Sequence, residues 1–191
     1  MRTVFFVVVL MFSPALLAQQ NNNAPIAEKY VLGWVPVDSI YKGMPRVKPD
    51  EENYLPDAAA LAELKQWRSP TDILVFFGSW CGDSKRELPR FFAALHTANN
   101  QFFSARFMGL DRSKKDSAGV AASHQITNVP TFIFLRDGQE LGRIVEQPAD
   151  ALEKEWVRIL QVDPAAAQRD KLWRAVSESL WPMIARASMI F

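Results

Sequence analysis

The segment ILVFF, residues 73–77, constrains the fold most strongly, because five consecutive apolar residues leave no polar face. Such a run of β-branched and aromatic residues predicts a strand covered on both sides, which is typical of a sheet with helices on each face. The segments FFSARFMGL (102–110) and TFIFL (131–135) predict further strands. The last is followed by Asp-Gly and by LGRIVE (141–146), which predicts a hairpin.

Helical patterns separate these strands. Asp57 can cap a helix that continues to Trp67, and SAGVAASHQ (117–125) predicts a short one. After residue 81, apolar residues with the spacing i, i+3, i+4 and i+7 predict a helix that buries one face: Leu88, Phe91, Phe92 and Leu95. A last helix follows Asp150, which can cap it. Near the N-terminus, YVLGWVPV is a short strand candidate, and no element is predicted from there to Pro56. The pattern predicts an α/β sandwich with a mixed sheet.

Residues 1–18, MRTVFFVVVLMFSPALLA, have the composition of a secretory signal peptide. A positive Arg2 precedes the apolar run 4–12, and a small residue, Ala18, ends the segment. The run is shorter than the about 20 residues that span a bilayer. We therefore expect cleavage before Gln19, a periplasmic or secreted protein, and no stable membrane insertion afterwards. An uncleaved anchor is the alternative.

The rest of the chain divides into three parts. Residues 19–28 are polar and lack periodicity, which predicts a flexible lead-in. The folded domain is expected at 29–162. Residues 163–191 predict an appended amphipathic helix, because apolar residues recur there at four-residue spacing. We expect this helix to cover the domain's own apolar surface; docking on a partner or membrane, or pairing two copies of the chain, is the alternative.

Charge and histidine content exclude two classes of function. Removal of residues 1–18 takes away Arg2 and no acid, which leaves 21 basic and 21 acidic residues. No basic stripe interleaved with aromatic residues is present, so nucleic acid is not an expected partner. The two histidines, His96 and His124, have no second ligand nearby in the sequence, so no metal site is expected.

Cys81 is the single cysteine of the chain and stands in the segment GSWCGDSKRELP. An unpaired cysteine in an exported chain either bonds to another molecule or remains a free reactive thiol. At the start of a helix, unpaired N–H groups and the helix dipole favour the thiolate form. Lys85 and Arg86 act in the same direction, and Asp83 opposes them. The alternative is that Cys81 packs as a small apolar side chain.

Three spaced features together resemble the thioredoxin superfamily. WCG (80–82) follows a buried strand, Pro89 lies eight residues after the cysteine, and NVPT (128–131) opens a later strand. The resemblance covers residues 72–160 and, more loosely, 29–67. It implies a thioredoxin-like three-layer α/β/α sandwich with a central mixed sheet, followed by the appended C-terminal helix.

The resemblance also implies roles for the neighbours of Cys81. Trp80 and Gly82 flank the cysteine, and Trp80 shields one side of the sulfur. A cis peptide bond before Pro130 is implied as well. It would hold the backbone of Val129 open for pairing with an extended substrate segment.

Two residues depart from the thioredoxin pattern. Ser84 stands where a second cysteine is usual, and Val75 stands where thioredoxins bury a proton-accepting acid. Cys81 is therefore able to form a mixed disulfide but unable to release itself as an intramolecular disulfide. We expect Ser84 to donate a hydrogen bond to the thiolate. The alternative is an ordinary residue of the first helical turn.

These residues predict a monothiol protein of thiol–disulfide exchange, reductase- or isomerase-like, that acts on client proteins or small thiols bearing disulfides. No bound cofactor is expected, with glutathione or another external thiol as co-reductant. The alternative is a non-catalytic module that captures client thiols or extended peptides without turnover. Iron–sulfur binding, as in monothiol glutaredoxins, is disfavoured because Asp83 places a charge where their CGFS motif is apolar.

Overall fold

The computed structural model describes residues 30–162 of the chain. The predicted signal peptide, the lead-in at 19–28 and the predicted C-terminal helix at 163–191 lie outside the described residues. Within the described part, no helix is both long enough and apolar enough to span a bilayer.

The elements alternate along the chain much as the sequence predicts. Their order is β1 (Gly33–Val35), α1 (Val37–Gly43), α2 (Val47–Glu52), α3 (Ala58–Gln66), β2 (Thr71–Phe77), α4 (Gly82–Ala98), β3 (Phe103–Gly109), α5 (Val120–Ser123), β4 (Thr131–Arg136), β5 (Gln139–Val145) and α6 (Leu152–Leu160).

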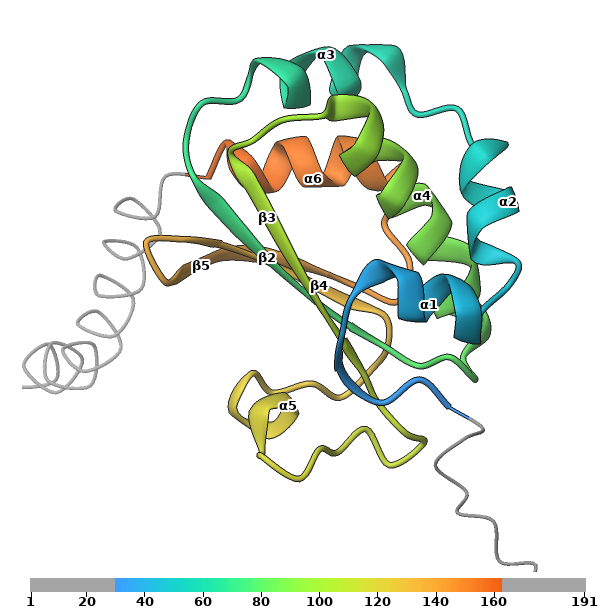
Figure 1. Cartoon of the computed structure of the whole chain (residues 1–191). Coiled ribbons are helices and arrows are strands. Elements are labelled where there is room, and N and C mark those ends of the chain that lie inside the picture. The colour runs from blue at the N-terminus through green and yellow to red at the C-terminus, as the bar shows by residue number, and fades with distance from the viewer. Residues whose placement is uncertain (1–29, 163–191) are drawn as a thin grey trace, which may run out of the picture.

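The strands form one mixed sheet with β2 at its centre (Figure 1). The order across the sheet is β1-β3-β2-β4-β5. β2 and β3 are parallel, whereas β1, β4 and β5 run antiparallel to their neighbours. The parallel pair needs a crossover connection, which α4 provides.

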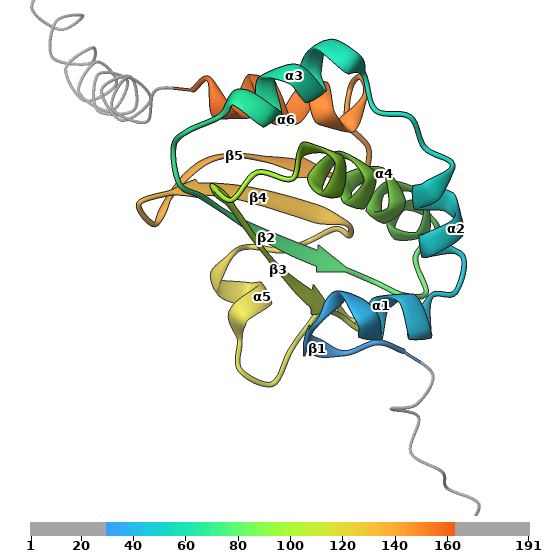
Figure 2. The same ribbon diagram turned by 45° about the horizontal axis from the view of Figure 1, so that its top comes forward.

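Helices cover both faces of this sheet, which confirms the predicted α/β/α sandwich. Figure 2 shows α3, α4 and α6 on one face and α5 on the other. Alternate side chains of β2 supply the two cores: Ile73, Val75 and Phe77 pack toward α4 and α6, and Leu74 and Phe76 pack toward α5. The all-apolar run of β2 is explained by this burial on both sides.

The helices α1 and α2 lie in a stretch where the sequence predicted no element. Ile40 of α1 and Val47 of α2 are buried in the core that also contains α4. Pro49 falls in the first turn of α2, where the missing N–H has no helical partner to lose. Both helices are short, so tertiary burial rather than local pattern stabilises them.

The predicted helix caps differ in outcome. Asp57 caps α3 as predicted, because its Oδ1 accepts hydrogen bonds from the N–H groups of Ala59 and Ala60, at 3.1 and 3.0 Å. The start of α6 lies one residue later than predicted: the cap position is Ala151, and Asp150 Oδ1 accepts its N–H at 2.8 Å.

Candidate active site

The site lies at the edge of the sheet where β2 and β3 end and β4 begins. Phe76 of β2 pairs with Thr131, the first residue of β4. The antiparallel register therefore places the segment before β4 beside the loop after β2, although the two are distant in sequence. In this way the chain brings together two segments: the cysteine loop, residues 78–81, and the proline loop, residues 128–130.

Cys81 is the N-cap residue of α4, and its side chain is half-buried. Its N–H donates to the Gly78 carbonyl at 2.9 Å, and its carbonyl accepts from the Lys85 N–H at 3.1 Å. The thiol donates to the Val129 carbonyl oxygen at 3.1 Å. The sulfur is thus anchored between the helix terminus and the proline loop while part of the residue faces solvent.

Val129 and Pro130 are both buried, and the peptide bond between them is cis. The Pro130 carbonyl accepts a hydrogen bond from the Glu146 N–H at 2.7 Å. The hydroxyl of Thr131 donates to the Asn128 carbonyl at 2.7 Å. These bonds fix the loop that faces the sulfur.

Trp80 covers one side of the cysteine loop. Its Nε1–H donates to the Leu110 carbonyl at 2.9 Å, which joins this loop to the end of β3. The guanidinium carbon of Arg112 lies 5.0 Å from the centre of the Trp80 ring, a cation–π arrangement. Trp80 and Cys81 both pack on the core beneath α5.

Ser84 is fully buried, and its Oγ accepts the Gly78 N–H at 3.1 Å. The hydrogen bond that we expected from Ser84 to the sulfur is not among the contacts of the described residues. The reason is that the first turn of α4 directs this side chain back to the end of β2. Val75 is likewise fully buried and lies opposite Phe107 and Phe132.

The remaining predicted residues lie around the first turn of α4. Gly82 is exposed, and a Cβ there would meet no atom within 4 Å. Asp83 accepts from Arg86 at 2.7 Å and from the Gln147 side chain at 3.3 Å. Lys85 is exposed. Arg86 is thus engaged with Asp83, and its charge is not free to act on the thiol as we expected.

Sequence reasoning missed two buried carboxylates near α4. Glu87 is 1% exposed and accepts from Arg86 Nε and Arg90 Nη1 at 2.7 and 3.2 Å. Glu153 is fully buried and accepts from the Tyr54 hydroxyl and the Asp57 N–H. The only sequence signal for Glu87 is its place between two arginines, a spacing that also suits a solvated helix face.

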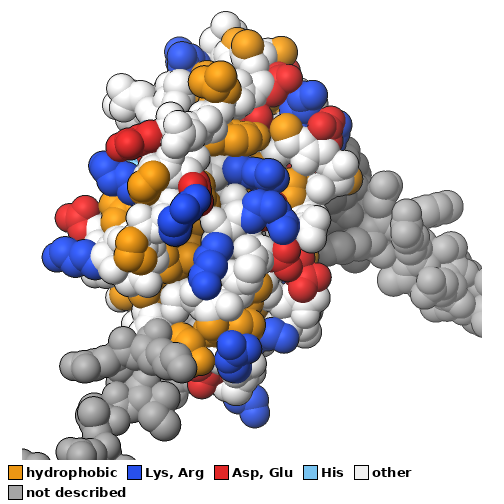
Figure 3. Space-filling view, turned by 90° about the vertical axis from the view of Figure 1, so that its right-hand side faces the viewer, with side chains coloured by type: hydrophobic (Ala, Val, Ile, Leu, Met, Phe, Trp, Pro, Cys, Tyr) orange, Lys and Arg blue, Asp and Glu red, His pale blue; other side chains and the backbone are white. Residues whose placement is uncertain are grey.

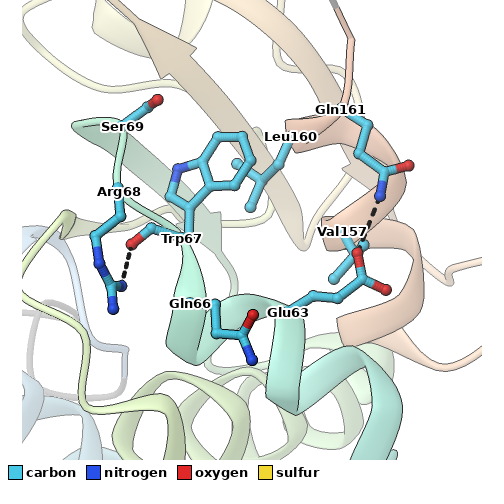
Figure 4. Close-up of a pocket in the computed structure, with 8 residues that line it drawn as sticks. All are labelled: Glu63, Gln66, Trp67, Arg68, Ser69, Val157, Leu160 and Gln161. Atoms are coloured by element: carbon cyan, nitrogen blue, oxygen red, sulfur yellow. Dashed lines mark hydrogen bonds between the residues drawn. The ribbon is translucent and has the colours of Figure 1, made fainter.

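Two other kinds of site, a metal centre and a surface hollow, do not involve Cys81 in the described structure. Among residues 30–162, no group of three or more His, Cys, Asp or Glu side chains is placed to hold a metal ion. A hollow of about 300 Å³ lies between the ends of α3 and α6 (Figure 4). It is lined by Trp67, Val157 and Leu160, and Gln161 donates across it to Glu63 at 3.0 Å. None of the residues that line this hollow belongs to the cysteine loop or to the proline loop.

A half-buried thiol at a helix N-terminus, beside a proline loop and on an α/β/α sandwich, defines a thioredoxin-fold protein. The comparisons agree. The family model described as Thioredoxin matches residues 59–158. The chain therefore belongs to the thioredoxin family.

Individual relatives have the following similarity. Mitochondrial thioredoxin-3 of Saccharomyces cerevisiae is 30% identical over 49% of this chain and 71% of its own length. A thioredoxin-like protein of Acanthamoeba polyphaga mimivirus is 29% identical over 47% of this chain and 62% of its own. Thioredoxin H2 of Arabidopsis thaliana is 32% identical over 43% of this chain and 57% of its own length. The chain thus spans less than two thirds of the length of the last two relatives.

Among solved structures, mitochondrial thioredoxin 3 from Saccharomyces cerevisiae in its oxidized form is similar at 24% identity. The match covers 56% of this chain and 95% of that one, with a TM-score of 0.35.

Proposed function

We propose that the protein acts in thiol–disulfide exchange through Cys81 alone. The observation that supports this most directly is the position of the sulfur. It is half-exposed at the N-terminus of α4 and hydrogen-bonded to the backbone of Val129. Reactive cysteines are often found at helix N-termini, and Cys81 stands at the start of the 17-residue α4.

The proposed reaction has two exchange steps. In the first, the Cys81 thiolate attacks one sulfur of a substrate disulfide, a new S–S bond forms, the old one breaks, and the second substrate sulfur leaves as a thiolate. Ser84 cannot carry out the second step, since it has no sulfur. An external thiolate, from glutathione or from the client's own second cysteine, therefore attacks the mixed disulfide and releases Cys81.

Clients are proposed to lie along the proline loop. The Cys81–Val129 hydrogen bond shows that the sulfur stands within reach of this backbone. An extended segment that approached the loop would meet backbone polar groups and the sulfur together, which is how strand-like peptide recognition supplies affinity. Export is part of the same proposal, on the strength of the signal-like residues 1–18. N-terminal sequencing of the protein from its native host would test it, with Gln19 as the expected first residue.

A single-label experiment tests the reactive thiol. Because Cys81 is the only cysteine, any thiol label reports this residue. We expect alkylation near neutral pH to be faster than that of free cysteine in the same buffer, and faster than that of the urea-unfolded protein. A native rate at or below the unfolded rate would contradict an activated thiol.

A second experiment distinguishes repeated reduction of a client from its permanent capture. Capture is an alternative because the chain has no second cysteine to release the client. With a disulfide client and excess glutathione, wild type should release reduced client repeatedly. Ser84→Cys should then turn over without glutathione once it is supplied with a dithiol reductant. A stoichiometric adduct that glutathione does not release would favour the capture module. Cys81→Ala is the control, and it should form no adduct.

A further inference from the structure

The loop between β3 and α5 places a base, Arg112, beside the cysteine loop. We define the basic loop as residues 111–116, which contain Arg112, Lys114 and Lys115. Arg112 lies over the Trp80 ring, and Trp80 is the neighbour of the reactive cysteine. Arg112 Nε also donates to the Tyr30 hydroxyl at 3.4 Å. These contacts hold one guanidinium on the β3 side of the site.

The acids of the basic loop are directed toward its own backbone. Asp111 Oδ1 accepts from the Ser113 N–H and hydroxyl at 2.9 and 2.6 Å. Asp116 accepts three backbone N–H groups at the start of α5, at 2.7 to 3.0 Å. These hydrogen bonds lower the pKa of both carboxyl groups, so both stay ionised at neutral pH.

The bases, in contrast, keep surface open to solvent, although Arg112 also contacts Trp80 and Tyr30. Arg112 and Lys115 are exposed and Lys114 is half-exposed. Within the described part of the chain, no ion pair joins any of these three to an acid. The positive groups of the basic loop are therefore available to a ligand, whereas its carboxylate oxygens are engaged.

The other side of the site carries both signs of charge, since the exposed Lys85 stands close to Asp83 in the first turn of α4. Asp83 is paired with Arg86, and Glu146 follows β5 and contacts Pro130 through its backbone. In the sheet, β3 lies on one side of β2, and β4 and β5 lie on the other. The charge on the β4 and β5 side is therefore mixed, whereas the bases of the basic loop, which join no ion pair in the described structure, lie on the β3 side. Figure 3 shows the face at the right-hand side of Figure 1, where Lys and Arg side chains lie across the centre with Asp and Glu side chains among and around them.

We propose that the basic loop selects disulfides that carry carboxylates close to the reacting sulfur and seats their acidic side on the β3 side of Cys81. This inference rests on the proposed function, since it names the substrate class of the same thiol. In water, a unit charge about 8 Å from a carboxylate changes the rate constant for their encounter by about two- to threefold. The effect of each base is therefore modest, and charge reversal should change it by roughly three- to tenfold.

The test compares two small disulfides of different charge. Dithiobis(nitrobenzoate) has two carboxylates, and dipyridyl disulfide is neutral at neutral pH. With either, the Cys81 thiolate forms a bond to one sulfur, the probe's S–S bond breaks, and the other half leaves as a coloured thiolate or thione. The quantity measured is the ratio of the anionic to the neutral rate constant, because it cancels changes in the intrinsic reactivity of the thiol.

Three charge reversals provide the comparison. Arg112→Glu removes the cation over Trp80, and Lys115→Glu changes an exposed side chain that makes no hydrogen bond or ion pair in the described structure. Lys65→Glu is the matched control. Lys65 lies in the last turn of α3, close to the start of β2. The site lies beyond the other end of β2, and a strand of seven residues is about 20 Å long.

We expect the ratio to fall about three- to tenfold in Arg112→Glu and by a smaller factor in Lys115→Glu, with no change in Lys65→Glu. The wild-type ratio should also fall between low and physiological salt. If both loop variants keep the wild-type ratio, the inference is wrong. If wild type reacts with the neutral disulfide no faster than unfolded protein does, the proposed function itself fails.

Discussion

Replacement of Ser84 by alanine distinguishes a structural serine from a catalytic one. Its Oγ is the acceptor for the buried N–H of Gly78, at 3.1 Å. Alanine leaves that N–H without a partner in a fully buried place. An unsatisfied buried donor costs about 1–3 kcal/mol, so we expect Ser84→Ala to lower the free energy of unfolding by that amount.

The expected effect on chemistry is small by comparison. Since Ser84 Oγ faces Gly78 rather than the sulfur, the alkylation rate of Cys81 in folded Ser84→Ala should stay within about twofold of wild type, a difference of about 0.4 kcal/mol in activation free energy. Urea titration measures the free energy of unfolding, and a thiol label measures the rate. Ser117→Ala is the control, because Ser117 is exposed and makes no side-chain hydrogen bond in the described structure; it should change stability by less than about 0.5 kcal/mol.

Two results would refute this reasoning. One is a stability of Ser84→Ala equal to that of Ser117→Ala, which would mean that the Gly78 N–H has another acceptor. The other is unchanged stability together with a tenfold or larger loss of alkylation rate. That outcome would show that the hydroxyl donates to the thiolate, as the sequence first suggested.

Three further substitutions test the surroundings of the site and the core. A Cβ at Gly78 would stand 2.7 Å from the Trp80 ring, so Gly78→Ala should cost about 1–3 kcal/mol in urea titration; a wild-type value would contradict this packing. Burial and the Glu153 carboxylate raise the pKa of Tyr54 to about 12. Its neutral phenol therefore contributes stability that is complete below the unfolded pKa near 10 and is lost as pH rises through about 12. In Tyr54→Phe, the free energy of unfolding should therefore fall less between about pH 10 and pH 12 than in wild type. Identical pH profiles of stability for the two proteins would show that Tyr54 does not cause this loss. Trp156 is fully buried against three phenylalanine rings with centroids 4.8–5.5 Å away, so Trp156→Ala should cost about 3–5 kcal/mol, and a loss below about 1 kcal/mol would contradict this burial.

The sequence was most informative where pattern and burial agree. The run 73–77 predicted β2, and the spacing of Leu88 to Leu95 predicted α4, because each pattern has the period of its own element. It was least informative at α1 and α2. Both helices are short. Pro49 lies within α2 and argues against a helix there, although the first turn of a helix tolerates proline.

The partners of individual polar side chains could not be predicted. Arg86 seemed free to favour a thiolate, yet it lies between Asp83 and Glu87. Arg112 belongs to a stretch for which the sequence predicts no element, yet it lies over Trp80. Each of these contacts depends on a side-chain rotamer or on the position of a neighbouring loop. Periodic patterns in the sequence predict neither.

Local sequence patterns were enough to predict the elements that flank the reactive residue, and the sequence contains a single cysteine with no second sulfur at position 84. The surroundings of that sulfur depend on how distant segments of the chain pack together. The register of β2 with β4 places Val129 against Cys81 across 48 positions of sequence, and the first turn of α4 directs the Ser84 hydroxyl to Gly78. The physical reason is range: local patterns specify helices and strands over a few residues, whereas a site is formed by strand pairing that joins residues far apart in the chain.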